Sequence, residues 1–184
     1  MKRSTMAACL LLLALPAAAH PGHDQGSGFL AGLLHPLTGI DHLLALLAVG
    51  LWSRQQVRGV VLAPTFLVMM ALGAASSGAR LLAALPALEL SIAATVLLLG
   101  GLVACAPDMQ KRVPPQLAVL IVAVCAFLHG LAHGNELSGM DSGAGFIVAS
   151  ALTMLAGATT GEQLRRMAGA MIGAAGVWLV ALAA

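Results

Sequence analysis

Two short stretches of the chain bring together histidine and acidic side chains of the kinds that bind transition metals. In chain order they hold His35, Asp41, His42, His129, His133 and Glu136. Imidazole nitrogen combined with carboxylate oxygen suits nickel, cobalt or zinc, whereas magnesium and calcium prefer shells built from oxygen alone. These residue types therefore predict that the protein handles a divalent transition-metal ion.

The spacing in the second stretch places its three side chains on one stripe of a helix. At about 100° per residue, His133 lies about 40° around the helix from His129, and Glu136 about 20° to the other side. Two histidines at positions i and i+4 can hold one ion from a single helix face. Cys125, four residues before His129, continues the stripe, and we interpret it as an ordinary small buried residue.

The first stretch requires a distorted helix if both of its histidines are to act together. His35 and His42 share a helix face, but an ideal rise per residue separates them by about 10 Å. Pro36 removes a backbone donor and Gly39 weakens a helix, so we expect a kink or local unwinding between the histidines. Depth along the helices groups His35, His129, His133 and Glu136 as an outer site, and Asp41 with His42 as an inner site.

The elements that carry these residues are predicted to lie in a membrane. Of the 184 residues, 60% are hydrophobic and 9% are charged, against about 25% charged in a soluble domain. The absence of tyrosine and the net charge of +2 exclude the stacking platforms and basic stripes of nucleic-acid-binding proteins. We expect an all-α polytopic protein in the lipid bilayer, and assembly as a homo-oligomer is compatible with this composition. Ionisable residues inside spans are costly and usually functional, which adds Glu89 as a further candidate ligand.

Residues 1–19 are typical of a cleaved signal peptide, with a basic start, a short apolar run and three final alanines. An uncleaved first helix is less favoured, because this apolar run is too short to cross about 30 Å of hydrocarbon. Cleavage would expose residues 20–28 as a periplasmic segment. Its side chains His20, His23 and Asp24 are either additional metal ligands or part of a polar lead-in to the first helix.

Residues 29–184 are predicted to form one transmembrane domain of six helices. The six apolar segments are Phe29–Trp52, Gly59–Gly78, Ala83–Cys105, Gln116–Asn135, Gly143–Thr160 and Met167–Ala183. The loops on one side hold Arg54, Arg58, Lys111, Arg112, Arg165 and Arg166, while the other side holds Arg80. By the positive-inside rule, the side with six basic residues is cytoplasmic. We therefore expect the mature N-terminus to be periplasmic, in a protein of the bacterial inner membrane. Three spans followed by three spans are also compatible with an inverted repeat, as in many transporters. In the last segment, Gly169-x-x-x-Gly173 predicts close helix packing.

The two stretches resemble the motifs of the HupE/UreJ family of nickel permeases. His35 to His42 reads H-P-x-x-G-x-D-H, and Phe127 to Glu136 reads F-H-G-x-A-H-G-x-E with Leu128 as an extra residue after the phenylalanine. The leader, the histidine-containing start and the six segments are similar to the family as well, so the likeness covers nearly the whole chain. It implies import of Ni²⁺ as the transported substrate, for hydrogenase or urease, with Co²⁺ or Zn²⁺ as alternatives. It also implies metal handling by the six residues named first. Composition and spacing alone predict only passage of a divalent transition metal.

Two other classes of protein are weighed against this interpretation. A membrane-embedded zinc-dependent hydrolase would use His and Asp ligands to activate water, with Glu136 or Glu89 as acid or base, but the chain lacks an H-E-x-x-H motif. A bis-histidine haem carrier usually has aromatic pocket walls, and aromatic residues make up only 3% of this chain. We therefore favour passage of a divalent ion.

Overall fold

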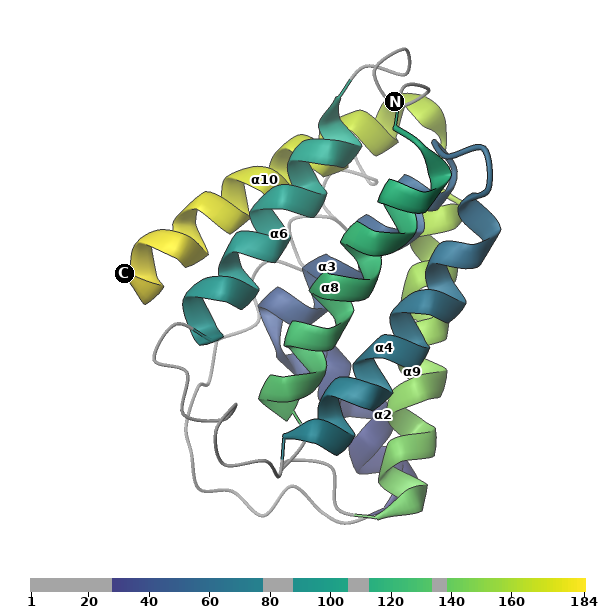
Figure 1. Cartoon of the computed structure of the whole chain (residues 1–184), viewed down its shortest axis with the longest axis vertical. Coiled ribbons are helices and arrows are strands. Elements are labelled where there is room, and N and C mark those ends of the chain that lie inside the picture. The colour runs from purple at the N-terminus through teal and green to yellow at the C-terminus, as the bar shows by residue number, and fades with distance from the viewer. Residues whose placement is uncertain (1–27, 78–87, 106–112, 134–138) are drawn as a thin grey trace, which may run out of the picture.

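The computed structural model describes residues 28–77, 88–105, 113–133 and 139–184, which form an all-helical bundle (Figure 1). Its elements are α2 (Phe29–Thr38), α3 (Ile40–Ser53), the short 3-10 helix η1 (Gly59–Val61), α4 (Leu62–Ser76), α6 (Leu88–Ala104), α8 (Pro115–His133), α9 (Met140–Ala158) and α10 (Glu162–Ala183). Helices satisfy their own backbone hydrogen bonds, which is what a chain of this hydrophobicity needs in lipid. The predicted signal peptide lies outside the described residues.

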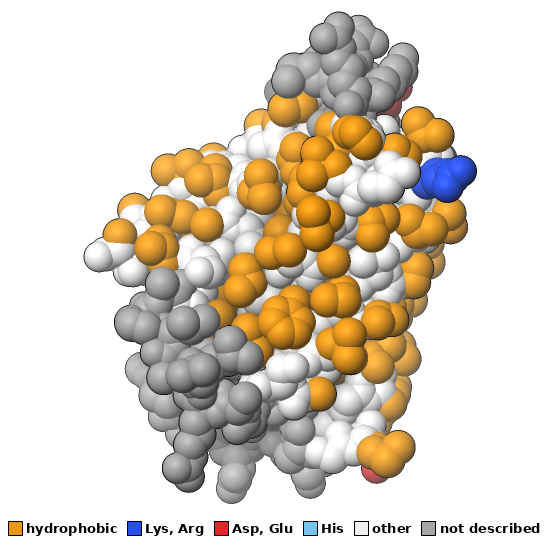
Figure 2. All heavy atoms as spheres, viewed as in Figure 1, with side chains coloured by type: hydrophobic (Ala, Val, Ile, Leu, Met, Phe, Trp, Pro, Cys, Tyr) orange, Lys and Arg blue, Asp and Glu red, His pale blue; other side chains and the backbone are white. Residues whose placement is uncertain are grey.

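Four helical units are long and apolar enough to cross a membrane: η1 with α4, α8, α9 and α10. The bent pair of α2 and α3 makes a fifth, while α6 is a shorter apolar helix of 17 residues. Each apolar segment expected from the sequence thus corresponds to a helix or a helix pair. Figure 2 shows hydrophobic side chains spread over the visible face, with charged groups toward its two ends. The expected all-helical, polytopic membrane fold is confirmed, with four to five candidate spans plus one shorter helix.

The first segment is broken at Gly39, as the sequence predicts. Gly39 is extended, with φ −82° and ψ 112°, and the axes of α2 and α3 differ by 85°. Side chains satisfy backbone groups on both sides of the break: the Thr38 hydroxyl donates to the carbonyl of His35 (2.8 Å), and the Asp41 carboxylate accepts from the N–H of His42 (2.8 Å). The break is therefore a built feature that starts a new helix one residue before Asp41.

The bent pair and α9 lie side by side and run in the same direction. A Cβ added at Gly145 would overlap the carbonyl oxygen of Phe29, near the start of both units. A Cβ added at Gly157 would lie 2.6 Å from the carbonyl oxygen of Leu47, near the end of both units. Contact is kept from one end of α9 to the other, so α2 and α3 together act as one broken span rather than as a loop that returns to its own side.

Two further helix pairs complete the bundle, and both depend on glycine. In the pair of α4 and α8, a Cβ at Gly73 would overlap the carbonyl of Phe127, and one at Gly130 would overlap that of Met70. In the pair of α6 and α10, three glycines of α10 face α6 in reverse chain order: Gly169 opposite Ala104, Gly173 opposite Gly100, and Gly176 opposite Leu97. The packing role expected for the glycine motif in the last segment matches this geometry, because small residues let helix backbones approach.

Candidate metal-handling site

The two histidine-bearing stretches meet in the core of the bundle. His42 lies in the first turn of α3 and His129 near the end of α8, and both side chains are 0% exposed. Their ring centroids are 5.5 Å apart, with the planes inclined at 73°. Two imidazoles from segments far apart in the sequence thus face each other edge to face at the centre of the molecule.

Two phenylalanines form walls around this pair. Phe66 of α4 lies with its ring centroid 6.4 Å from that of His42 and 6.3 Å from that of His129. Phe146 of α9 lies 5.0 Å from His42, and both phenylalanines are buried. These apolar rings keep bulk water away, so an ion entering this space must exchange hydration water for protein ligands.

A threonine from a third helix holds the ring of His129. The Thr95 hydroxyl of α6 donates to the carbonyl of Ile92 (2.6 Å) and lies 3.0 Å from Nε2 of His129. Because its proton is used on that carbonyl, the hydroxyl accepts from Nε2–H. The hydrogen-bond network therefore assigns the proton of His129 to Nε2 and leaves the lone pair of the ring on Nδ1.

The other predicted ligands in the described part of the chain lie at different distances from this pair. His35 of α2 is partly exposed, and its ring centroid is 5.7 Å from that of Phe146, which contacts His42 as well. Asp41 is partly exposed at the start of α3, while Glu89 is exposed in the first turn of α6. Cys125 is buried, in agreement with its interpretation as a small core residue.

Several predicted ligands cannot be placed by their side chains. His133 is the last residue of α8, and its side chain is outside the described set, as are the residues His20, His23, Asp24 and Glu136. Within residues 28–77, 88–105, 113–133 and 139–184, no three His, Cys, Asp or Glu side chains converge into a group that could hold a metal ion.

The grouping expected from depth along straight helices differs from the structure in one respect. That grouping put His129 with His35 and left His42 deeper, whereas the structure brings His129 against His42. The reason is the 85° bend at Gly39, which gives α3 a direction of its own, so residue counting along α2 misjudges where His42 lies.

Three residues of the site were not singled out in the sequence, namely Phe66, Thr95 and Phe146, and neither was the buried Ser150 on the same helix as Phe146. The Ser150 hydroxyl, one turn beyond Phe146 on α9, is 0% exposed and has no hydrogen-bond partner among the described residues. The sequence holds a signal that could have pointed to the hydroxyl residues and another that could have pointed to the phenylalanines. Thr95 and Ser150 are hydroxyls within long apolar runs, and Phe66 and Phe146 are two of only four phenylalanines in the chain.

The fold and the buried imidazole pair together define a class of protein. Polar side chains enclosed between membrane-spanning helices mark ion or substrate pathways, because burial there is costly unless it serves a function. A multi-pass helical protein with such a pair at its centre has the construction of a membrane transporter.

Comparison with known proteins gives the family. Residues 8–184 match the family described as HupE / UreJ protein. The chain is 36% identical over 194 residues to Protein HupE from Rhizobium leguminosarum bv. viciae, covering 98% of this chain and 99% of that one. No solved structure matches the chain. This chain therefore belongs to the HupE/UreJ family, and the resemblance noted in the sequence is confirmed.

Membership of the HupE/UreJ family narrows the function of this chain to transport. Proteins of the HupE/UreJ family are transporters, associated with nickel uptake for hydrogenase or urease. The zinc-dependent hydrolase considered above is therefore excluded as a class, because the family consists of transporters and not of enzymes.

Proposed function

We propose that this protein imports Ni²⁺ across the bacterial inner membrane and that the ion passes between His42 and His129. The observation that carries the proposal is the buried pair itself: two imidazoles from the first and fourth segments with centroids 5.5 Å apart. The association of the family with nickel uptake supports the choice of cargo and its delivery to hydrogenase or urease.

The chemistry of the pair suits passage of a borderline metal ion. Imidazole nitrogen favours nickel, cobalt or zinc over magnesium and calcium. Two nitrogens bound to one such ion, each at about 2.0–2.1 Å, lie no more than about 4 Å apart. Because Thr95 holds the ring of His129, the ring of His42 has to turn toward it for one ion to reach both nitrogens. Two nitrogen ligands fill only part of a metal coordination sphere, and conduction requires binding that is weak enough to allow release.

Thr95 has the role of a positioning residue in this proposal. Its hydroxyl, 3.0 Å from Nε2 of His129, fixes the ring and its tautomer. Nδ1 of His129 is then the nitrogen that binds the ion. Such outer-shell hydrogen bonds orient metal-binding histidines and raise their basicity as ligands.

His35 and Asp41 belong to the outer approach to the pair. Phe146 contacts both histidines of the first segment, with its ring centroid 5.7 Å from that of His35 and 5.0 Å from that of His42. An ion handed from His35 to His42 therefore passes close to Phe146. Asp41, which begins α3 next to His42, supplies a carboxylate on this approach.

The remaining predicted ligands extend the approach outward. His133 and Glu136 follow His129 at the end of α8 and beyond it, and they serve as the entrance ligands. The mature N-terminus captures ions in the periplasm through His20, His23 and Asp24. Glu89, exposed at the start of α6, is an additional acid on the same periplasmic side.

Six crossings with a periplasmic N-terminus account for the helix pairs. With that topology the first and fifth spans run in the same direction, and the third and sixth run in opposite directions, as their glycine contacts require. We include a 3+3 inverted repeat in the proposal. Such a repeat relates span one to span four, span two to span five, and span three to span six. It therefore converts the packed pair of spans one and five into the packed pair of spans four and two. Spans three and six, which also pack together, are exchanged with each other.

The decisive experiment measures uptake of radioactive nickel by cells that express single variants. His42→Ala and His129→Ala should each lower saturable uptake at least about tenfold, because each removes one of two ligands. Cys125→Ala is the matched control, since Cys125 is buried one turn before His129 on the same helix. Membrane insertion is measured in parallel with a fluorescent C-terminal fusion. Uptake at the wild-type level by both fully inserted histidine variants would refute the assignment.

A further inference from the structure

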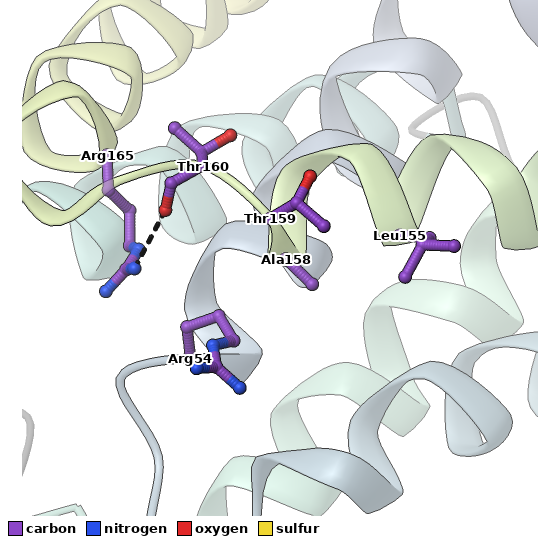
Figure 3. A pocket seen from close by; sticks show the side chains of 6 residues that line it. All are labelled: Arg54, Leu155, Ala158, Thr159, Thr160 and Arg165. Atoms are coloured by element: carbon purple, nitrogen blue, oxygen red, sulfur yellow. Dashed lines mark hydrogen bonds between the residues drawn. The ribbon is translucent and has the colours of Figure 1, made fainter.

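An open cavity of about 420 Å³ lies where the end of α3, the end of α9 and the start of α10 come together (Figure 3). Its volume falls in the range of about 300–1,000 Å³ that is typical of small-molecule sites. The residues that line it are Arg54, Leu155, Ala158, Thr159, Thr160 and Arg165. None of these residues belongs to the proposed nickel pathway.

Two arginines from separate parts of the chain give this cavity its charge. Arg54 is exposed and directly follows α3, whereas Arg165 lies near the start of α10 and is partly buried. One guanidinium nitrogen of Arg165, Nη2, donates to the carbonyl of Thr160 (2.9 Å), and its buried Nε has no partner among the described residues. In the described part of the chain, neither arginine is paired with a carboxylate. The cavity therefore carries two positive charges that an anion can neutralise.

The threonine hydroxyls on the cavity wall already donate to the protein backbone, so they are not donors to a ligand. The hydroxyls of Thr159 and Thr160 both donate to the carbonyl of Ala156, at 2.9 Å and 3.2 Å. The donors left for a ligand are thus the guanidinium groups, whose planar arrangement of N–H groups matches the oxygens of a phosphate. An oxyanion such as a phosphate therefore fits the donors of this cavity.

We propose that the cavity binds the phosphate headgroup of an anionic phospholipid. It lies at the arginine-bearing ends of the helices, where lipid headgroups meet a membrane protein. Leu155 on the cavity wall is 58% exposed, and Leu152, one turn away on α9, is equally exposed. This apolar surface leads from the arginines toward the middle of the bilayer. A phospholipid uses both the charged and the apolar part, whereas free phosphate would use only the charged part.

The bound lipid connects parts of the chain that are distant in sequence. Its phosphate links Arg54, after the first span, to Arg165, in the last helix. With the orientation proposed above, the lipid belongs to the cytoplasmic leaflet. The lipid therefore stabilises the cytoplasmic end of the bundle, and this site does not depend on nickel.

The test is the thermal unfolding temperature of the detergent-purified full chain, with phosphatidylglycerol, phosphatidylcholine or inorganic phosphate added separately. Phosphatidylglycerol should raise the Tm by roughly 4–8 °C, the shift that two arginine–lipid contacts correspond to in a chain of this size. The other two additives should change it little. A shift of equal size with inorganic phosphate would overturn the lipid as the source of the anion.

Variants of the lining arginines test whether the Tm shift caused by phosphatidylglycerol arises at this cavity. Arg54→Gln/Arg165→Gln should lose most of the shift caused by phosphatidylglycerol. The matched control is Arg58→Gln/Arg166→Gln, which removes the same charge from two exposed residues that do not line the cavity. An equal shift in both double variants would overturn the proposal. Arg54→Gln alone, at an exposed position, should lose at least part of the shift, and it provides the same test if the change at Arg165 impairs folding.

Discussion

Replacing Thr95 by valine removes one hydroxyl from the site and leaves its shape almost unchanged. Valine and threonine are nearly isosteric, so the loss concerns the contact of 3.0 Å with Nε2 of His129. Both side chains are buried, and a buried donor deprived of its partner costs about 1–3 kcal/mol. Loss of an outer-shell hydrogen bond to a metal-binding histidine typically weakens metal binding about 10–100-fold. We therefore expect the nickel concentration for half-maximal uptake to rise about 10–100-fold in Thr95→Val.

The assay is initial-rate uptake of radioactive nickel over a wide range of nickel concentrations, which separates apparent affinity from maximal rate. Thr95→Ser keeps the hydroxyl and should restore the affinity. Thr153→Val is the matched control: Thr153 is also buried and donates to a carbonyl of its own helix, that of Ala149 (2.8 Å). If Thr95→Val takes up nickel with the half-saturation of the wild type, or if Thr153→Val shows the same defect, the positioning role of Thr95 is wrong.

Two further predictions concern the packing of the bundle and the periplasmic segment. Gly145→Ala should lower the free energy of unfolding in detergent by about 1–3 kcal/mol, because the added Cβ meets the backbone of α2. Gly143→Ala on the same helix places its Cβ in open space and should be neutral or slightly stabilising. Equal Tm values for the two variants would contradict the packing described here. If residues 20–24 capture ions as proposed, their deletion should weaken nickel uptake mainly at scarce metal. An unchanged dependence of uptake on nickel concentration would show that the segment is only a linker.

Much of the fold could be predicted because lipid imposes simple rules on a sequence. Long apolar runs must become helices, since no other partner exists for their backbone groups in hydrocarbon. Pro36 and Gly39 within such a run predict a break, and the structure has one at Gly39. The precise direction of α3 after the break was not predictable, because it depends on the contacts that α3 makes with α6 and α9 rather than on the residues at the break.

The site could be predicted only in part, for a related reason. Histidines within apolar spans stand out by their chemistry, so His42 and His129 were recognisable as candidates before any packing was known. Phe66 and Phe146 are ordinary hydrophobic residues by type, and only their positions beside the imidazoles make them walls of a site. Thr95 is also an ordinary residue by type. It matters because its hydroxyl contacts His129, which lies 34 residues away in the sequence.

Hydrophobicity, charge and ligand type are properties of single residues, so the sequence was enough to indicate a helical membrane protein and to pick out the side chains that are candidates for metal binding. The tertiary structure alone decided that His42 meets His129 and that Arg54 and Arg165 share one cavity. Such pairings arise from the bend at Gly39 and from close helix contacts, and neither is written in the spacing of any one segment.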